Sequence, residues 1–317
     1  KLAAAAVLVG VAAAATVAAG VPLRLRGAGA APLAAVLAWA TVGFARARQP
    51  EAFAQAWLPV ALAVLTALSA AALADRPGGR GRLLGAFVVA HLGCGAYALA
   101  QYYGLDPLGW TIDYGRGRVF STLGNPNFLA GQMTLALPVL AAAGCGGPPV
   151  SRWLARLAFV LAFLAEIFAQ TRGAWLGLAA GAAVAGAGWI AWRDALPPPR
   201  RLAWAGAAVL ALTAVFSIPA LSPTGLSLPA QWASSGNLEQ QSARQRFFWW
   251  RAAAVLLRAH PVAGAGLGNF VREFPPAARR VFAPWADLPP AFADHPHDDF
   301  LFILCEHGVI GLGCSAG

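Results

Sequence analysis

Charged side chains are scarce in this chain. They make up 11% of its 317 residues, and Lys1 is the sole lysine. A soluble domain usually carries about 25% charged residues, so a globule of this length could not cover its surface with so few. Hydrophobic residues make up 59% of the chain, and its mean hydropathy is +0.61. These values exclude a disordered chain, a nucleic-acid-binding protein and an ordinary cytoplasmic enzyme.

Cysteine and acidic residues are also few. The four cysteines include no Cys-x-x-Cys pair, and three lie in apolar runs, so neither a disulfide framework nor a zinc site is expected. The chain has 13 acidic and 23 basic residues, which gives a net charge of +10. Because the arginines are spread thinly between apolar runs, as in loops beside membrane helices, this surplus favours a membrane protein over a nucleic-acid partner.

Long apolar runs are what the chain does have. A membrane-spanning helix needs about 20 mostly apolar residues, and strand-like alternation is absent. The sequence predicts helices at nine segments: Leu2–Val21, Pro32–Phe44, Ala52–Ala74, Leu83–Tyr103, Val119–Ala143, Trp153–Ala169, Gly173–Trp192, Leu202–Leu221 and Phe300–Gly313.

We therefore expect an all-α polytopic membrane protein. Residues 1–221 would form a bundle of about eight transmembrane helices, 222–299 a large loop outside the membrane, and 300–317 the start of a further helix. The chain does not begin with Met and stops within an apolar stretch, so we expect a fragment that lacks residues at both ends.

Arginines are denser in every second loop. The denser loops hold Arg24 and Arg26, then Arg76, Arg80 and Arg82, then Arg152 and Arg156, then Arg193, Arg200 and Arg201. By the positive-inside rule these loops are cytoplasmic. The long segment 222–299 and Arg172 then lie on the opposite face.

A helix is predicted from Gln240 to about His260, at the start of the long loop. Three arginines recur every seven residues along it and share one stripe, which we expect to be a solvated face: Arg244, Arg251 and Arg258. Arg246 lies about 200° from Arg244, at about 100° per residue, on the side of Trp249 and Trp250. A guanidinium against aromatic rings is costly unless it meets an anion, so Arg246 is a candidate anion ligand.

Arg172 lies between two apolar runs, in Thr171-Arg172-Gly173. It is either an interfacial arginine whose head reaches water or an anion ligand at membrane depth. Glu166 is near enough in sequence to serve as its structural counter-ion.

The end of the long loop reads Asp294-His295-Pro296-His297-Asp298-Asp299. Two histidines flanked by carboxylates could bind a divalent metal. His297 could equally act as a general base, or these histidines could be structural. The spacing alone leaves the three alternatives open.

Two further motifs have ordinary structural explanations. Asn125 and Asn127 precede an apolar run, where they would cap a helix or contact a substrate hydroxyl. The run from Gly264 to Gly268 resembles a dinucleotide-binding loop, but no strand precedes it. We interpret it as a helix stop followed by a turn.

Several short motifs, in this order, resemble the O-antigen ligase superfamily. They are Ser121-Thr122-Leu123-Gly124-Asn125-Pro126-Asn127-Phe128, Thr171-Arg172-Gly173-Ala174-Trp175, Arg246 four residues before Trp250, His260-Pro261 before Gly264-x-Gly266, and His297 before Leu301 and Glu306-x-Gly308-x-x-Gly311. The superfamily comprises lipopolysaccharide O-antigen ligases, polysaccharide polymerases and protein O-oligosaccharyltransferases. The N-terminal third is similar only as apolar helices.

This resemblance implies a glycosyltransferase of the GT-C type in the bacterial inner membrane, with a helix bundle and one large, partly helical periplasmic loop. Such enzymes move a glycan from an undecaprenyl-diphosphate carrier to a hydroxyl of lipid A core, a glycan or a protein, without cofactor or metal. The family's catalytic residues map to Arg172, Arg246 and His297. The resemblance also makes five residues candidate substrate contacts: Asn125, Asn127, Trp250, Asp298 and Glu306.

The implied mechanism follows from these residue types. Two guanidiniums, Arg172 and Arg246, would stabilise the charge that grows on the departing diphosphate, and His297 would take the acceptor proton. Direct displacement would invert the anomeric carbon. Where the family usually has His-Asn, this chain has His297-Asp298, and a carboxylate there would either orient the imidazole or support a metal.

Two other classes remain as alternatives. A secondary transporter would need broken helices and charges at the membrane midplane, whereas the predicted helices here are nearly free of charge. A structural or polysaccharide-binding membrane protein would not need His and Arg gathered on one face.

Overall fold

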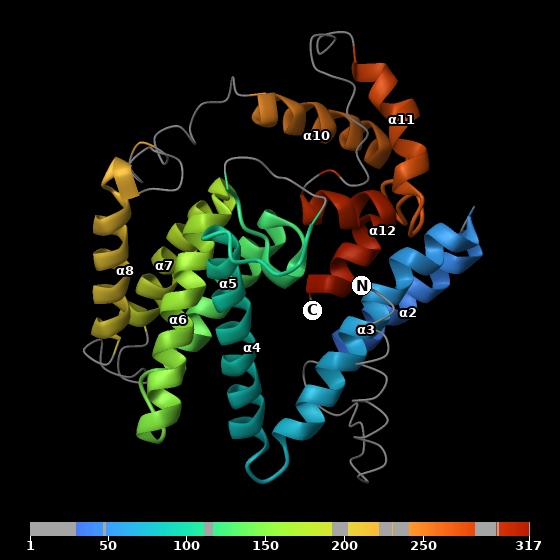
Figure 1. The fold of residues 1–317 in the computed structure, drawn as a ribbon. Coiled ribbons are helices and arrows are strands. Elements are labelled where there is room, and N and C mark those ends of the chain that lie inside the picture. Colours follow the sequence, from blue (N-terminus) through green and yellow to red (C-terminus); the bar gives the residue numbers. More distant parts are fainter. Residues whose placement is uncertain are drawn as a thin grey trace. The chain divides into compact units, whose positions relative to one another are not determined.

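A computed structural model of the chain describes residues 30–46, 49–110, 117–191, 202–221, 230, 241–282, 296 and 298–316. Within these ranges the regular elements are all helices (Figure 1), which confirms the all-α expectation. The α-helices are α2 (Ala30–Val42), α3 (Pro50–Ala74), α4 (Gly79–Tyr102), α5 (Pro126–Ala143), α6 (Pro149–Ala169), α7 (Arg172–Ala191), α8 (Ala203–Phe216), α10 (Gln241–Ala259), α11 (Phe270–Val281) and α12 (Asp299–Ala316). The expected helix Leu2–Val21 lies outside the described residues.

Three of the described helices, α3, α4 and α5, are long and apolar enough to cross a membrane. α2 and α8 are apolar but shorter. Helices also form at the expected positions of α6, α7 and α12. The expected total of about eight spans stays a prediction.

The helix expected over Val119–Ala143 begins later, at Pro126. Asn125 is extended at φ −149°, and Gly124 is left-handed at φ 72°, so the preceding residues turn instead of continuing the helix. Proline suits the first helical position, because the N–H it lacks would have no partner within the helix. The apolar run places this boundary too early, whereas the expected capping by Asn125 agrees with the observed start.

Helix α11 was not expected from the sequence. Pro275 and Pro276 lie inside it, and proline usually ends a helix. Phe270, Phe274 and Ala277 are buried on one face of α11 and pack against α10. This burial stabilises a helix that its two prolines disfavour.

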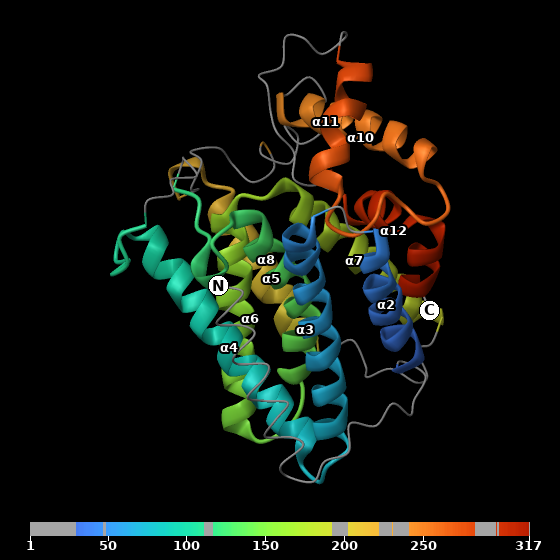
Figure 2. The ribbon, with the colours of Figure 1, turned by 90° about the vertical axis from the view of Figure 1, so that its right-hand side faces the viewer.

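The chain divides into two compact units, Lys1–Arg80 with Asn237–Gly317, and Gly81–Gly236. In the second unit α5 and α6 run side by side (Figures 1 and 2) and form the centre of the core. α6 buries alanines at helical spacing, including Ala155, Ala158 and Ala162, against Leu129 and Met133 of α5. Small side chains of this kind let membrane helices approach closely.

In the first unit, α10 packs across α11 and α12, and α2 packs along α12. Phe248, Ala252 and Leu256 form the buried face of α10. α12 is interrupted at Gly308, whose backbone has φ 65° and ψ −167°. Figure 2 shows α12 as two limbs that run in different directions. Only glycine adopts this conformation readily.

Candidate functional site

Helix α10 is joined to the segment around Pro296. The indole N–H of Trp250 donates a hydrogen bond to the carbonyl oxygen of Pro296 at 3.1 Å. Arg246 lies one turn before Trp250 on the same stripe of α10, and its side chain is exposed. The exposed Arg246 therefore lies one helical turn from Trp250, which contacts Pro296, the residue before His297 in the chain.

The arginines expected on the solvated stripe differ in exposure. Arg251 and Arg258 are exposed, as expected, but Arg244 is half-buried. Arg246, expected to face the aromatic side, is exposed while Trp250 is half-buried. Exposure leaves the Arg246 guanidinium open to an anionic ligand.

Asp298 begins α12. Its Oδ1 accepts the backbone N–H of Leu301 at 2.8 Å, which is a helix-capping contact. His297, its proposed orientation by Asp298, and the alternative metal site with His295 fall outside the described residues. The described part of the chain contains no group of three or more His, Cys, Asp and Glu side chains that could hold a metal.

Glu306 is buried, with 3% of its surface exposed. Its Oε1 accepts the backbone N–H groups of Gly268 at 3.0 Å and Phe270 at 3.2 Å. One carboxylate oxygen therefore holds the end of the glycine-rich loop and the start of α11. These contacts favour a positioning role for Glu306 over direct contact with a substrate.

The glycine-rich loop packs against α12 around Glu306, and we call this contact, between residues 261–270 and 305–310, the glycine joint. Ala265 N–H bonds to Cys305 O at 2.7 Å, and Gly266 N–H to Glu306 O at 3.0 Å. A Cβ on Gly264 would lie 2.3 Å from the carbonyl carbon of Glu306. A Cβ on Gly308 would lie 2.2 Å from the oxygen of Val262. The glycines of this motif are therefore required by close backbone approach.

In the other unit, Asn125 caps α5, since its Oδ1 accepts Asn127 N–H at 2.8 Å. The Oδ1 of Asn127 accepts two hydrogen bonds at 3.3 Å, from Arg118 Nη2 and Thr171 Oγ1. Arg118 Nε also donates to Ala169 O at 3.0 Å. The start of α5 is thereby joined to the turn between α6 and α7.

Arg172 is the first residue of α7 and directly follows Thr171 in that turn; its side chain is exposed. Arg118 thus holds the turn that carries Arg172, although it was not a candidate from the sequence. Its position in the sequence could have identified Arg118 as a candidate, because it directly precedes the apolar residues that lead into the Ser121–Phe128 motif.

The expected pairing of Glu166 with Arg172 is wrong. Glu166 is completely buried, at 0% exposure, and its Oε1 accepts Thr134 Oγ1 at 3.2 Å. Its Oε2 has no hydrogen-bond partner among the residues described. Glu166 lies within α6, whereas Arg172 begins α7 after the left-handed residue Gln170 ends α6.

The Ser121 segment is held by the end of α4. Gln101 Oε1 accepts the N–H groups of Phe120 at 3.2 Å and Ser121 at 2.7 Å, and Gln101 Nε2 donates to Asp106 at 3.0 Å. Desolvation would raise the pKa of Asp106, but hydrogen bonds, the first of them from Leu108 N–H, outweigh it and lower the pKa. Asp106 is therefore an ionised anchor for this network near neutral pH.

Comparison with known proteins gives one match. The family model described as O-antigen ligase matches residues 157–315, which is half of the chain. No curated protein and no solved structure matches the chain. The match includes Arg172, Arg246 and the glycine joint, whereas Arg118 and Asn127 precede it. The chain belongs to the O-antigen ligase family.

Proposed function

We propose that the protein is a membrane glycosyltransferase that moves a glycan from undecaprenyl diphosphate to an acceptor hydroxyl at the periplasmic face of the bacterial inner membrane. Membership in the O-antigen ligase family, with its ligases and polymerases, supports an enzyme of this general kind. The observation that carries the proposal is the contact between Trp250 and Pro296. It joins the stripe of Arg246 to the segment of His297, the two features the reaction needs most.

Arg246 binds the diphosphate in this proposal. A planar guanidinium can donate two parallel hydrogen bonds to phosphate oxygens. As the sugar–phosphate bond breaks, its electron pair passes to the diphosphate, and the guanidinium stabilises the added charge. An exposed side chain on a helix with one buried, well-packed face is suited to this role, because the packed helix provides the orientation.

His297 accepts the acceptor proton. The acceptor oxygen attacks the anomeric carbon from the side opposite the diphosphate, so the configuration inverts and a new C–O bond replaces the broken one. Neutral imidazole is the side chain best suited to remove such a proton near pH 7. Asp298, the residue after His297, is anchored because its Oδ1 caps the start of α12.

Arg172 has the second diphosphate-binding role by its position in the family motif. Support comes from the rigid turn that carries it, since Arg118, Asn127 and Thr171 hold that turn through side-chain hydrogen bonds. No metal or cofactor takes part in the proposed reaction.

The acceptor separates three activities within the superfamily: ligation to lipid A core, polymerisation of a glycan, and transfer to a protein hydroxyl. Reconstitution with an undecaprenyl-diphosphate glycan and each acceptor class tests this directly. Mass analysis of the products should show one acceptor gaining the glycan with loss of the diphosphate carrier. Absence of transfer to all three acceptors, from a folded protein, would reject the proposal.

Sidedness provides a second test. An impermeant thiol reagent should label Ser234→Cys from outside the cell, and Arg80→Cys only after the membrane is opened. Labelling of Ser234→Cys from the cytoplasmic side alone would contradict both the topology and the proposed reaction face.

A further inference from the structure

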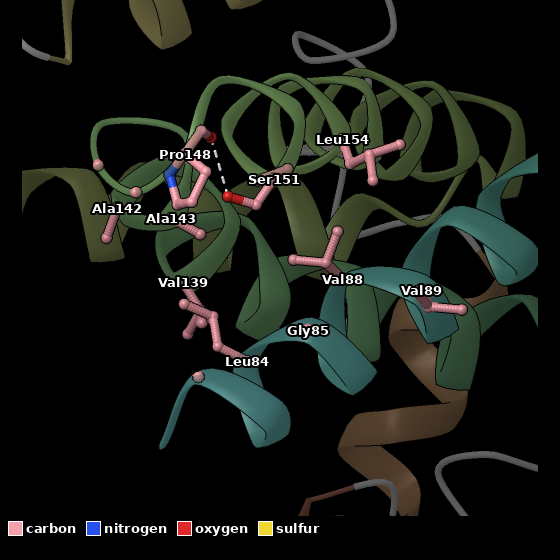
Figure 3. A pocket seen from close by; sticks show the side chains of 14 residues that line it. Leu84, Gly85, Val88, Val89, Val139, Ala142, Ala143, Pro148, Ser151 and Leu154 are labelled. Atoms are coloured by element: carbon pink, nitrogen blue, oxygen red, sulfur yellow. Dashed lines mark hydrogen bonds between the residues drawn. The ribbon is translucent and has the colours of Figure 1, made fainter. Parts of the chain in front are cut away.

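An apolar cavity lies at one end of the unit formed by residues 81–236. Its volume is about 800 Å³, and it is lined by the start of α4, the end of α5 and the start of α6. Pockets that hold organic ligands typically measure about 300–1,000 Å³. Figure 3 shows Leu84 and Val88 of α4, Val139 of α5 and Leu154 of α6 around this space.

Polar groups contribute little to this cavity. The hydroxyl of Ser151 donates to Pro148 O at 2.9 Å (Figure 3), so it is already engaged. The other lining residues are glycine, alanine, proline, valine and leucine. Because α4 and α5 are apolar enough to cross a membrane, the cavity would open among hydrocarbon chains. An acyl chain fits these walls better than a sugar or a nucleotide would.

Helical spacing places two arginines beside residues that line the cavity. Arg152 lies four residues after Pro148 and three before Ala155, both of which line it, so the three share one side of α6. Arg82 lies three residues before Gly85 and seven before Val89, on the cavity side of α4. The Nε of Arg152 is buried and has no hydrogen-bond partner among the residues described.

A third arginine nearby is engaged within the protein. The Nε of Arg156 donates to Gly144 O at 3.0 Å, at the end of α5. Its guanidinium lies 4.9 Å from the ring of Trp153 and 5.2 Å from that of Trp204. Tryptophans beside arginines mark the headgroup level of a membrane protein. The cavity therefore begins just inside that level.

The two acidic residues described in this unit lie away from the cavity: Asp106 follows the far end of α4, and Glu166 lies near the far end of α6. Among the described residues of this unit, the charges at the cavity end are therefore positive. Basic pockets between transmembrane helices bind anionic lipid headgroups.

We propose that this cavity binds one anionic phospholipid, with an acyl chain between α4, α5 and α6 and the phosphate at Arg82 and Arg152. None of the residues that line the cavity is a proposed glycan-transfer residue, and the proposal does not depend on the proposed function. By the positive-inside rule this end faces the cytoplasm, where anionic headgroups are available.

The test uses the full chain, purified in detergent, delipidated and titrated with dioleoyl phosphatidylglycerol, with bound lipid counted by native mass spectrometry. One phosphatidylglycerol should bind tightly, and phosphatidylcholine or phosphatidylethanolamine with the same chains should not displace it. Arg152→Gln and Arg82→Gln should each weaken binding about fivefold. Equal binding of phosphatidylcholine and phosphatidylglycerol would overturn the proposal.

A cavity-filling variant tests the acyl-chain position. A Cβ on Gly85 meets nothing within 4 Å, so Gly85→Phe can enter the cavity without a backbone clash. Gly93, also on α4, has equally open surroundings but does not line the cavity, so Gly93→Phe is its matched control. Gly85→Phe should lose the bound lipid, and Gly93→Phe should retain it at a similar melting temperature. Full phosphatidylglycerol affinity in a folded Gly85→Phe protein would overturn the proposal.

Discussion

Trp250 and Pro296 are joined by a single hydrogen bond, from the indole N–H to the carbonyl oxygen at 3.1 Å, across 46 positions of sequence. Trp250 is also in edge contact with Phe247, at 5.4 Å between ring centroids. The bond links the helix of Arg246 to the chain just before His297. It is therefore the contact through which a change in α10 would reach the proposed base.

Trp250→Phe tests this link, because it keeps an aromatic ring and removes the N–H donor. A hydrogen bond contributes on the order of 1 kcal/mol, so we expect transfer to slow roughly fivefold to tenfold. The loss should fall on kcat, with little change in KM or melting temperature.

Trp57→Phe is the matched control, since it also removes an indole donor, here to Thr41 Oγ1 at 3.0 Å. It should leave kcat near that of the parent. Equal kcat losses in the two variants would show that the Trp250 bond has no special role.

The glycine joint predicts that alanine substitution will lower stability at its glycines but not at a glycine with open surroundings. Gly264→Ala and Gly308→Ala place a Cβ 2.2–2.4 Å from backbone atoms, at positive φ. Backbone strain of this kind costs on the order of 1–3 kcal/mol, before the clash is added. We expect both variants to unfold at clearly lower temperature.

Gly131→Ala is their control, because its Cβ would meet nothing within 4 Å and its backbone is helical. Replacing glycine by alanine there should leave the melting temperature unchanged or raise it. Parent-like melting of Gly308→Ala would contradict the described kink in α12.

The hydrogen bonds of Arg118 predict that replacing it will disturb the position of Arg172, which it does not need to contact. Arg118→Gln removes the bonds to Ala169 O, Asn127 and Thr171. If the turn positions Arg172, kcat should fall about tenfold or more, and Arg118→Lys should recover only part of it, because lysine lacks the planar fork. Arg118→Gln with parent kcat would show that the turn needs no such support.

Metal dependence separates the two roles left open for His297. A general base needs no metal, so transfer should survive exhaustive chelation with EDTA. His297→Ala should also be far more damaging than His295→Ala. Activity that disappears with EDTA and returns with one divalent ion would replace the base by a metal site that includes both histidines.

The sequence predicted the helical fold well because its apolar runs are long. It located α10 within a residue of its bounds, Gln241–Ala259. It missed α11, since Pro275 and Pro276 oppose a helix locally, although packing against α10 and the bond from Phe270 N–H to Glu306 stabilise it. Phe270, Phe274, Ala277 and Val281 do recur at helical spacing, and the two prolines outweighed that signal.

The candidate site was predicted unevenly for a similar reason. Arg172 and Arg246 became candidates from their places beside apolar and aromatic residues and from motif order. Arg118 was missed because its importance comes from hydrogen bonds to residues 9 to 53 positions away. Glu306 was found, but its two backbone partners at Gly268 and Phe270 could not be read from spacing.

Glycan transfer by Arg246→Lys tests the central claim most directly. Proteoliposomes with equal amounts of parent, Arg246→Lys or Arg251→Lys would receive an undecaprenyl-diphosphate glycan and an acceptor. Product and released undecaprenyl diphosphate would then be measured together. Loss of one preorganised contact to developing charge costs on the order of 10²–10³ in rate, so Arg246→Lys should fall by that factor, and Arg251→Lys should match the parent. Parent-like transfer by Arg246→Lys would contradict the assignment of Arg246 as the diphosphate ligand.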